Sequence, residues 1–225
     1  MSMDKNFERW ILVAGGHMDV RRLVKLYQEE QRQGSCGLLG VDSGALSIDI
    51  TGLSSDAVIG DFDSVTEEEK RRILASCPEQ LVLNPIKDDT DMEAAVHFLI
   101  GKKPKHVTVL GATGSRLDHT MTNLRLLVLF EKAGIPAVLE NECNRVRVIS
   151  GDTVLKKENC FGTYISLLPV EGPVRSVTMT GFKYETKDIT LEPFSSLGVS
   201  NELVSEEGEI RFSGGMLYLM ETRDG

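Results

Sequence analysis

Short apolar runs alternate with helix-like stretches in the part of the chain before Cys143, and this alternation most constrains the fold. Strands separated by helical patterns of this kind predict βαβ units and a mostly parallel sheet. The expected strands are Trp10–Ala14, Cys36–Val41, Ala57–Ile59, Leu81–Leu83, His106–Leu110 and Ala137–Leu139. The expected helices are Asp19–Arg32, Thr66–Ser76, Asp91–Lys102 and Arg116–Ala133.

After Cys143 the pattern changes to short strand-like runs separated by Gly, Pro and Asn, without a long helical stretch. Such a pattern is typical of a small antiparallel sandwich or barrel. The runs are Arg145–Ile149, Val154–Leu155, Thr163–Leu168, Val174–Thr180, Asp188–Leu191, Glu209–Phe212 and Met216–Met220. We therefore expect two domains: a Rossmann-like α/β domain over 1–142, and a C-terminal β-sandwich over 143–225.

Charge and composition exclude several classes of protein. The formal net charge of −9 disfavours a general nucleic-acid binder, because the phosphate backbone would repel it. No apolar run is long enough to span a bilayer, and the first residues do not resemble a secretory signal. The four cysteines lack the close spacing of zinc ligands, so we expect reduced thiols in a cytoplasmic protein that does not contact a membrane.

Two carboxylates, Asp61 and Asp63, follow the predicted strand Ala57–Ile59. Carboxylates at this spacing in a turn can converge on one hard cation such as Mg²⁺, which bridges to substrate phosphates. The alternative is an acidic loop that caps the next helix, because Ser64 and Glu67 have capping-box spacing.

A second acidic segment, Lys87–Asp91, follows the next predicted strand. Thr90 and Glu93 have the spacing of a capping box, but a cap does not require Asp88 and Asp89. Both acidic loops are expected at the carboxyl edge of the sheet, where open α/β proteins bind ligands. Together they favour a metal site over a solvated loop.

A glycine-rich turn, Gly111–Gly114, leads into the helix predicted from Arg116. Glycines allow the backbone to approach a ligand closely, and a helix N-terminus favours an anion. Arg116 adds a fixed charge suited to phosphate, although a packing turn is the simpler interpretation. In this helix the spacing predicts a buried stripe at Leu117, Met121, Leu124 and Val128.

Taken in order, these segments resemble the thiamine pyrophosphokinase family over most of the chain. The resemblance rests on Gly60–Ser64, Asp88–Asp91, Gly114–His119 with Asn123, Asp42–Ala45, Gly181–Tyr184 and Ser200–Glu202. Departures lie at Ser43 and at Ala112-Thr113, where glycines are common in the family.

The resemblance implies an enzyme that moves the diphosphate of ATP to the hydroxyl of thiamine with Mg²⁺, giving thiamine diphosphate and AMP. It implies a homodimer whose active site lies at the subunit interface. Asp61, Asp63 and Asp88 would hold Mg²⁺, with Asp91 and Arg116 also catalytic. Ser200 and Asn201 would contact thiamine. The ATP side would consist of Asp42, Gly111, Thr113, Gly114, Ser115, Arg116, Asp118, His119 and Asn123.

Two other functions compete with this one. Asp61–Val65 also fits the D-x-D-x-[TV] pattern of haloacid-dehalogenase-type phosphatases, although that motif usually follows the first strand. A non-catalytic nucleotide sensor could use the same loops and would bind ATP without turnover.

Overall fold

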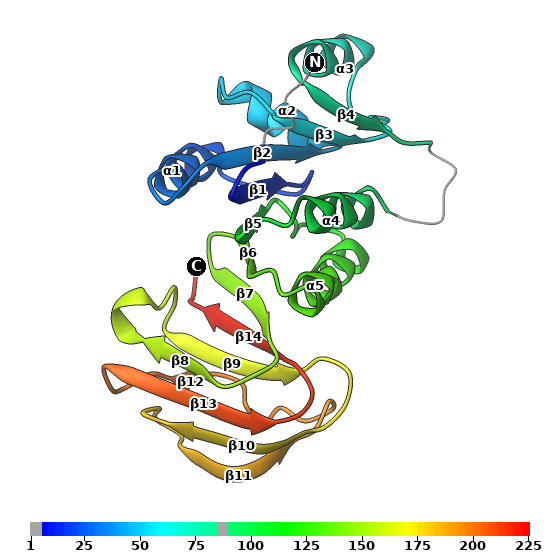
Figure 1. Ribbon diagram of the computed structural model, residues 1–225. Helices are drawn as coiled ribbons and strands as arrows, with labels where there is room; N and C mark the ends of the chain where they lie inside the picture. The colour runs from blue at the N-terminus through cyan, green and yellow to red at the C-terminus, as the bar shows by residue number, and fades with distance from the viewer. Residues whose placement is uncertain (1–5, 85–89) are drawn as a thin grey trace. The chain divides into compact units, whose positions relative to one another are not determined.

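The computed structural model describes residues 6–84 and 90–225 (Figure 1). The chain divides into two compact units, residues 1–137 and 138–225, and each is described by itself. The change of pattern in the sequence predicts a division between 142 and 143, shortly after strand β6 (Ala137–Glu140).

The first unit contains a parallel sheet with the strand order β5-β1-β2-β3-β4, which confirms the expected α/β class. Val13 at the end of β1 is level with Gly40 in β2 and Leu110 in β5, so the loops after these strands leave at one edge. The strands are β1 (Arg9–Val13), β2 (Cys36–Val41), β3 (Ala57–Gly60), β4 (Glu79–Val82) and β5 (His106–Leu110).

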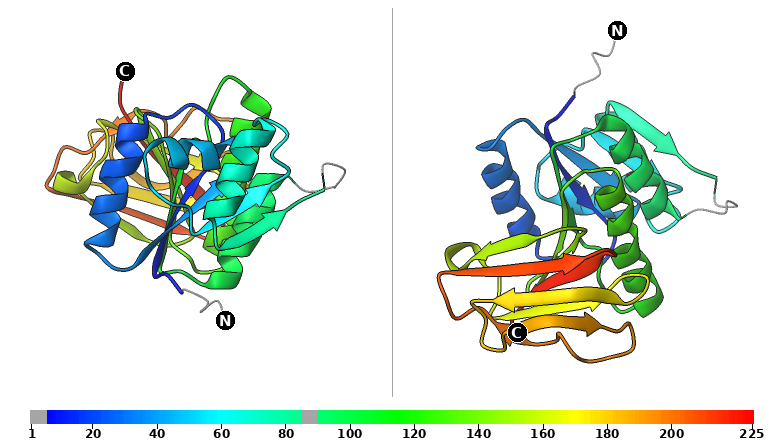
Figure 2. Two further views of the ribbon diagram at one scale, coloured as in Figure 1. Left: turned by 90° about the horizontal axis from the view of Figure 1, so that it is seen from above. Right: turned by 60° about the horizontal axis from the view of Figure 1, so that its bottom comes forward.

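Helices cover both faces of this sheet (Figure 2). Ile11 and Val13 pack in one cluster with Leu23 and Leu26 of α1, whereas Trp10 makes an edge contact with Phe98 of α4 on the opposite face. Alternate residues of β1 therefore pack against the helices on opposite faces of the sheet, as the pleat of a strand requires. The helices are α1 (Val20–Gln31), α2 (Ser43–Ile50), α3 (Glu67–Ser76), α4 (Asp91–Lys102) and α5 (Leu117–Lys132).

The expectations for the helices were incomplete in two places. Helix α2 follows β2 directly and is not among the expected helices. In α5 the predicted apolar stripe is only half correct: Val128 is buried and Leu124 is partly buried, whereas Leu117 and Met121 are 75% and 52% exposed. The buried positions are Asn123, Leu126, Leu127, Val128 and Phe130.

The second unit is an antiparallel β-sandwich, as expected. In one sheet β9 and β7 flank β14, with β12 beside β9 and β6 beside β7; the other sheet has the order β11-β10-β13-β8. Ile165 and Leu219 from the first sheet share a core with Val177 and Ile210 from the second. The strands are β7 (Asn144–Ile149), β8 (Thr153–Lys156), β9 (Tyr164–Pro169), β10 (Val174–Thr180), β11 (Thr186–Leu191), β12 (Asn201–Glu202), β13 (Glu207–Ser213) and β14 (Leu217–Thr222), with a short 3-10 turn at Lys157–Asn159.

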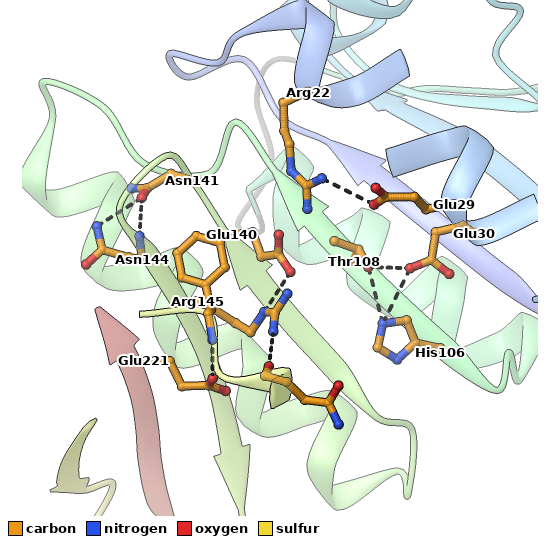
Figure 3. A network of polar contacts seen from close by, with 12 residues as sticks. Arg22, Glu29, Glu30, His106, Thr108, Glu140, Asn141, Asn144, Arg145 and Glu221 are labelled. Carbon is orange, nitrogen blue, oxygen red and sulfur yellow. Dashed lines mark hydrogen bonds and ion pairs between the residues drawn. The ribbon is translucent and has the colours of Figure 1, made fainter. Parts of the chain in front are cut away.

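Buried acidic side chains in each unit are paired (Figure 3). In the first, Glu30 accepts a hydrogen bond from Arg9 at the start of β1 and another from Thr108 of β5. In the second, Glu140 accepts from Arg145 at 2.8 Å, within the hairpin that β6 and β7 form. Such pairs neutralise carboxylates that would be costly to bury alone.

All four cysteines are free thiols; Cys36 and Cys77 are buried, and Cys143 and Cys160 are partly buried. Among the residues described, no helix is both long and apolar enough to cross a membrane.

Candidate active site

A cavity of about 510 Å³ opens in the first unit where β1, β2 and β5 end. β1 is the strand at which the order reverses, because its neighbours are β2 and β5. Loops that leave such a switch point in opposite directions create a crevice, and α/β proteins bind ligands there. The loops after β1, β2 and β5 all line this cavity.

Two glycines bring the loops after β1 and β5 together. The Gly16 N–H donates to Gly111 O at 2.7 Å, and a Cβ at Gly16 would lie 2.4 Å from that oxygen. Gly111 has a φ of +63°, a conformation that favours glycine. One wall of the cavity is therefore main chain, open to close approach by a ligand.

The structure collects around this cavity every residue expected on the ATP side. The members are Asp42, Gly111, Thr113, Gly114, Ser115, Arg116, Asp118, His119 and Asn123. Asp91, expected to be catalytic, also lines it. The sequence reasoning did not select Gly15, Gly16 or Thr90, although a glycine pair directly after the first strand was visible as a signal.

The N-terminus of α5 presents Arg116 and Asp118 to the cavity. The Arg116 guanidinium holds the pKa of Asp118 down at about 2, and the His119 N–H donates to the same carboxylate. Asn123, one turn further, is buried and donates to Ala112 O at 2.8 Å. Asn123 therefore fixes the glycine-rich loop against α5.

Three carboxylates meet beside the cavity. Each of Asp42, Asp61 and Asp63 offers an oxygen, and these oxygens lie within 4.8 Å of one another. Asp42 follows β2 and the other two follow β3, which is the neighbouring strand. Asp42 also lines the cavity, so it connects the carboxylate cluster to the pocket.

The conformation of the β3 loop explains why Asp61 and Asp63 converge. Phe62 between them has a φ of 60° and is buried, so the two flanking carboxylates remain at the surface of the loop. Lys70 of α3 donates to Asp61 O at 2.9 Å, and the Asp63 N–H donates to the Asp61 side chain. The nearby charge of Asp61 raises the pKa of Asp63.

These residues fit a hard divalent cation. Clustered carboxylate oxygens are the ligands that Mg²⁺ prefers, and a cation would relieve the repulsion that raises the pKa of Asp63. In addition, Asp42 Oδ1 is buried with no hydrogen-bond partner in the described chain. Asp88, the third expected ligand, lies outside the described residues.

In the second unit, the two residues expected to contact thiamine lie at the start of β12. Ser200 has a φ of 58°, and its N–H donates to Ser166 Oγ at 3.0 Å. Asn201 is buried; its Oδ1 accepts from the Tyr184 N–H at 3.0 Å and its Nδ2 donates to Tyr184 O at 2.8 Å. The amide is thus hydrogen-bonded to the main chain of the Gly181–Tyr184 turn, and its expected contact with thiamine stays a prediction.

The site combines glycine loops at the switch point of a parallel sheet, a helix N-terminus and a carboxylate cluster. These features are typical of the class of α/β proteins that bind phosphorylated ligands through a divalent cation. Family models described as the catalytic domain and the vitamin B1 binding domain of thiamin pyrophosphokinase match residues 32–139 and 152–217. The thiamine pyrophosphokinase of Bacillus subtilis is 31% identical over 95% of this chain and 98% of its own. The chain belongs to the thiamine pyrophosphokinase family.

Solved structures of thiamine pyrophosphokinases have the same fold as this chain. The crystal structure of the Bacillus subtilis protein superposes with a TM-score of 0.85 at 29% identity, covering 96% of this chain and all of the other. The Geobacillus thermodenitrificans thiamin pyrophosphokinase gives 0.82 at 28% identity, with 96% and 98% covered.

Proposed function

We propose that this protein transfers the diphosphate group of ATP to the hydroxyl of thiamine, giving thiamine diphosphate and AMP. The hydroxyl oxygen forms a bond to the β-phosphorus of ATP while the bond from that phosphorus to the α,β-bridging oxygen breaks. AMP leaves with that oxygen, and the hydroxyl proton passes to a base. Positioning and charge stabilisation supply most of the catalysis in such transfers.

The observation that carries the proposal is that Asp42 belongs both to the carboxylate cluster and to the wall of the cavity. A triphosphate in the cavity would therefore lie next to the cluster. The cavity wall also contains Asp91 and Asp118. An anionic ligand at so acidic a site requires a cation to screen it.

The metal side of the site consists of Asp61, Asp63 and Asp42, with Asp88 and Asp91 contributed by the second acidic loop. A Mg²⁺ ion bound there would neutralise phosphate oxygens of ATP. These carboxylates hold and orient the ion, and one carboxylate near the hydroxyl acts as the general base.

On the nucleotide side, the main chain at Gly111–Ser115 approaches the phosphates, and Arg116 stabilises charge that develops during transfer. Asp118 orients Arg116, and Asn123 holds the loop. His119 completes this wall of the cavity.

The thiamine side is proposed at Ser200 and Asn201 in the β-sandwich, with Asn201 shaping the Tyr184 turn that borders the ligand. The resemblance further leads us to propose a homodimer in the cytoplasm, with the active site completed across the subunit interface. In this scheme 1–142 is the catalytic domain and 143–225 binds thiamine and the partner subunit.

The deciding experiment incubates the full chain with ATP, Mg²⁺ and thiamine and measures AMP and thiamine diphosphate. Equimolar formation of both supports the proposal. Free phosphate without AMP would instead indicate a phosphatase, and ATP binding without turnover would indicate a sensor.

Sedimentation of the active protein tests the shared site. We expect a dimer, because a site built from two subunits cannot form in a monomer. A monomer with full activity at nanomolar concentration would refute it.

A further inference from the structure

Ser64 does not have the helix-capping role that its spacing to Glu67 indicates. The cap of α3 is Thr66, which exchanges hydrogen bonds with Glu69 in a complete capping box. Ser64 Oγ instead donates to Asp42 Oδ2 at 2.6 Å. This contact joins the loop after β3 to the loop after β2.

Asp42 needs such a support. Its backbone is in a sparsely populated conformation, with φ 50° and ψ −125°, and its N–H is held by Ile59 O at 2.9 Å. The backbone is thereby anchored to β3, but the carboxylate can still rotate about its side-chain bonds. The hydrogen bond from Ser64 occupies Oδ2. The other oxygen, Oδ1, is buried and has no hydrogen-bond partner among residues 6–84 and 90–225, so it remains available to bind a cation.

We propose that Ser64 is a positioning residue for the divalent cation: it orients the Asp42 carboxylate so that Asp42 completes the ligand set of Asp61 and Asp63. A short hydrogen bond from a hydroxyl to a carboxylate is charge-assisted and fixes the rotamer. Groups that orient metal ligands in this way typically contribute about 10–100-fold to metal affinity. The inference rests on the proposed function only in identifying the cation as the one that serves ATP.

The test measures Mn²⁺ binding to the full chain by electron paramagnetic resonance, without ATP or thiamine. Ser64→Val and Ser64→Thr form a matched pair, because valine has the same shape as threonine but carries a methyl group in place of the hydroxyl. We expect Ser64→Val to weaken binding by about tenfold and Ser64→Thr to retain it within about twofold.

Two further variants separate positioning from a general structural effect. Thr66→Ala removes the α3 cap and should lower the melting temperature while leaving Mn²⁺ affinity unchanged. Asp42→Asn should weaken binding, and adding Ser64→Val to it should cause little further loss if Ser64 acts through Asp42.

Equal Mn²⁺ affinity of Ser64→Val and Ser64→Thr would overturn the inference, as would an undiminished effect of Ser64→Val in the Asp42→Asn background. If Mn²⁺ binding follows the expected order but no AMP forms from ATP and thiamine, the inference stands and the proposed function fails. If thiamine diphosphate forms but Ser64→Val binds Mn²⁺ normally, only the inference fails.

Discussion

Arg116 and Asp118 form a forked ion pair at the N-terminus of α5, with Nη2 2.5 Å from Oδ2 and Nε 3.2 Å from Oδ1. Both side chains are well exposed, so the ion pair adds little to the stability of the protein. Its effect is to orient the Arg116 guanidinium. The pKa of Asp118, lowered to about 2 mainly by this hydrogen bond, keeps the pair ionised at neutral pH. Its small stabilising effect is present above the ordinary pKa of Asp and is lost as the pH falls toward 2.

We predict that Arg116→Ala lowers kcat by about 100-fold, the lower end of the effect of removing one donor to a developing oxyanion, with little change in melting temperature. Arg116→Lys should be intermediate, because it keeps the charge but loses the planar fork. Steady-state kinetics with thermal melting measures both. A wild-type kcat for Arg116→Ala would require the phosphate role to be withdrawn.

Asp63→Asn should abolish turnover without unfolding the protein. We expect kcat to fall by more than about 100-fold. Mutation of residues that only hydrogen-bond to metal ligands already lowers metal affinity or activity by about 10–100-fold. Because repulsion from Asp61 raises the pKa of Asp63, removing this charge should leave the metal-free melting temperature unchanged or higher. Near-normal activity at limiting Mg²⁺ would show that Asp63 does not hold the cation.

Asn201→Ala should raise the thiamine KM about tenfold, or roughly 1.4 kcal/mol, with little change in the KM for ATP. The reason is that the Tyr184 turn loses its two hydrogen bonds to the Asn201 amide. The same loss should destabilise the protein by about 1 kcal/mol, because two partly buried main-chain groups lose their hydrogen-bond partners. Denaturant unfolding measures this part, and an unchanged free energy of unfolding would contradict the positioning role.

Alkylation should distinguish the cysteines. Burial raises the pKa of the Cys36 thiol to about 12 and that of Cys77 to about 11. Iodoacetamide at pH 8 should therefore modify Cys143 and Cys160 before these two, as mass spectrometry of native protein would show. Because the folded-state values are raised, the stability that the neutral thiols contribute is present below about pH 9 and is lost as the pH rises toward 11 and 12.

The sequence predicted the features that depend on local pattern. The parallel sheet, the β-sandwich and the proximity of Asp61 to Asp63 all follow from spacing and alternation along short segments. The residues that the family resemblance placed on the ATP side share one cavity, because Asp42 follows β2 and the others lie in the loop after β5 or in the first two turns of α5.

Features that depend on strand order could not be predicted in this way. Asp42 joins Asp61 and Asp63 because β2 lies beside β3, and Gly16 reaches Gly111 because β1 lies beside β5. The first half of the stripe predicted in α5 was wrong, because Leu117 and Met121 match a buried stripe in spacing but are exposed at the end of the helix that borders the cavity. The family resemblance placed Asn201 beside thiamine, whereas its hydrogen bonds to Tyr184 could not be predicted, because a two-residue strand such as β12 leaves no periodic signal.

The unusual backbone conformation of Asp42 lowers the stability of the fold, whereas its carboxylate is proposed to serve the cation site. A non-glycine residue held at φ 50° and ψ −125° stores about 1–3 kcal/mol of strain. Asp42→Gly should relieve part of that strain and raise the midpoint of urea unfolding, while it removes a carboxylate from the cluster. A search for heat-resistant variants of this protein would then recover Asp42→Gly as a stabilised but inactive form, and a screen that requires thiamine diphosphate would eliminate it.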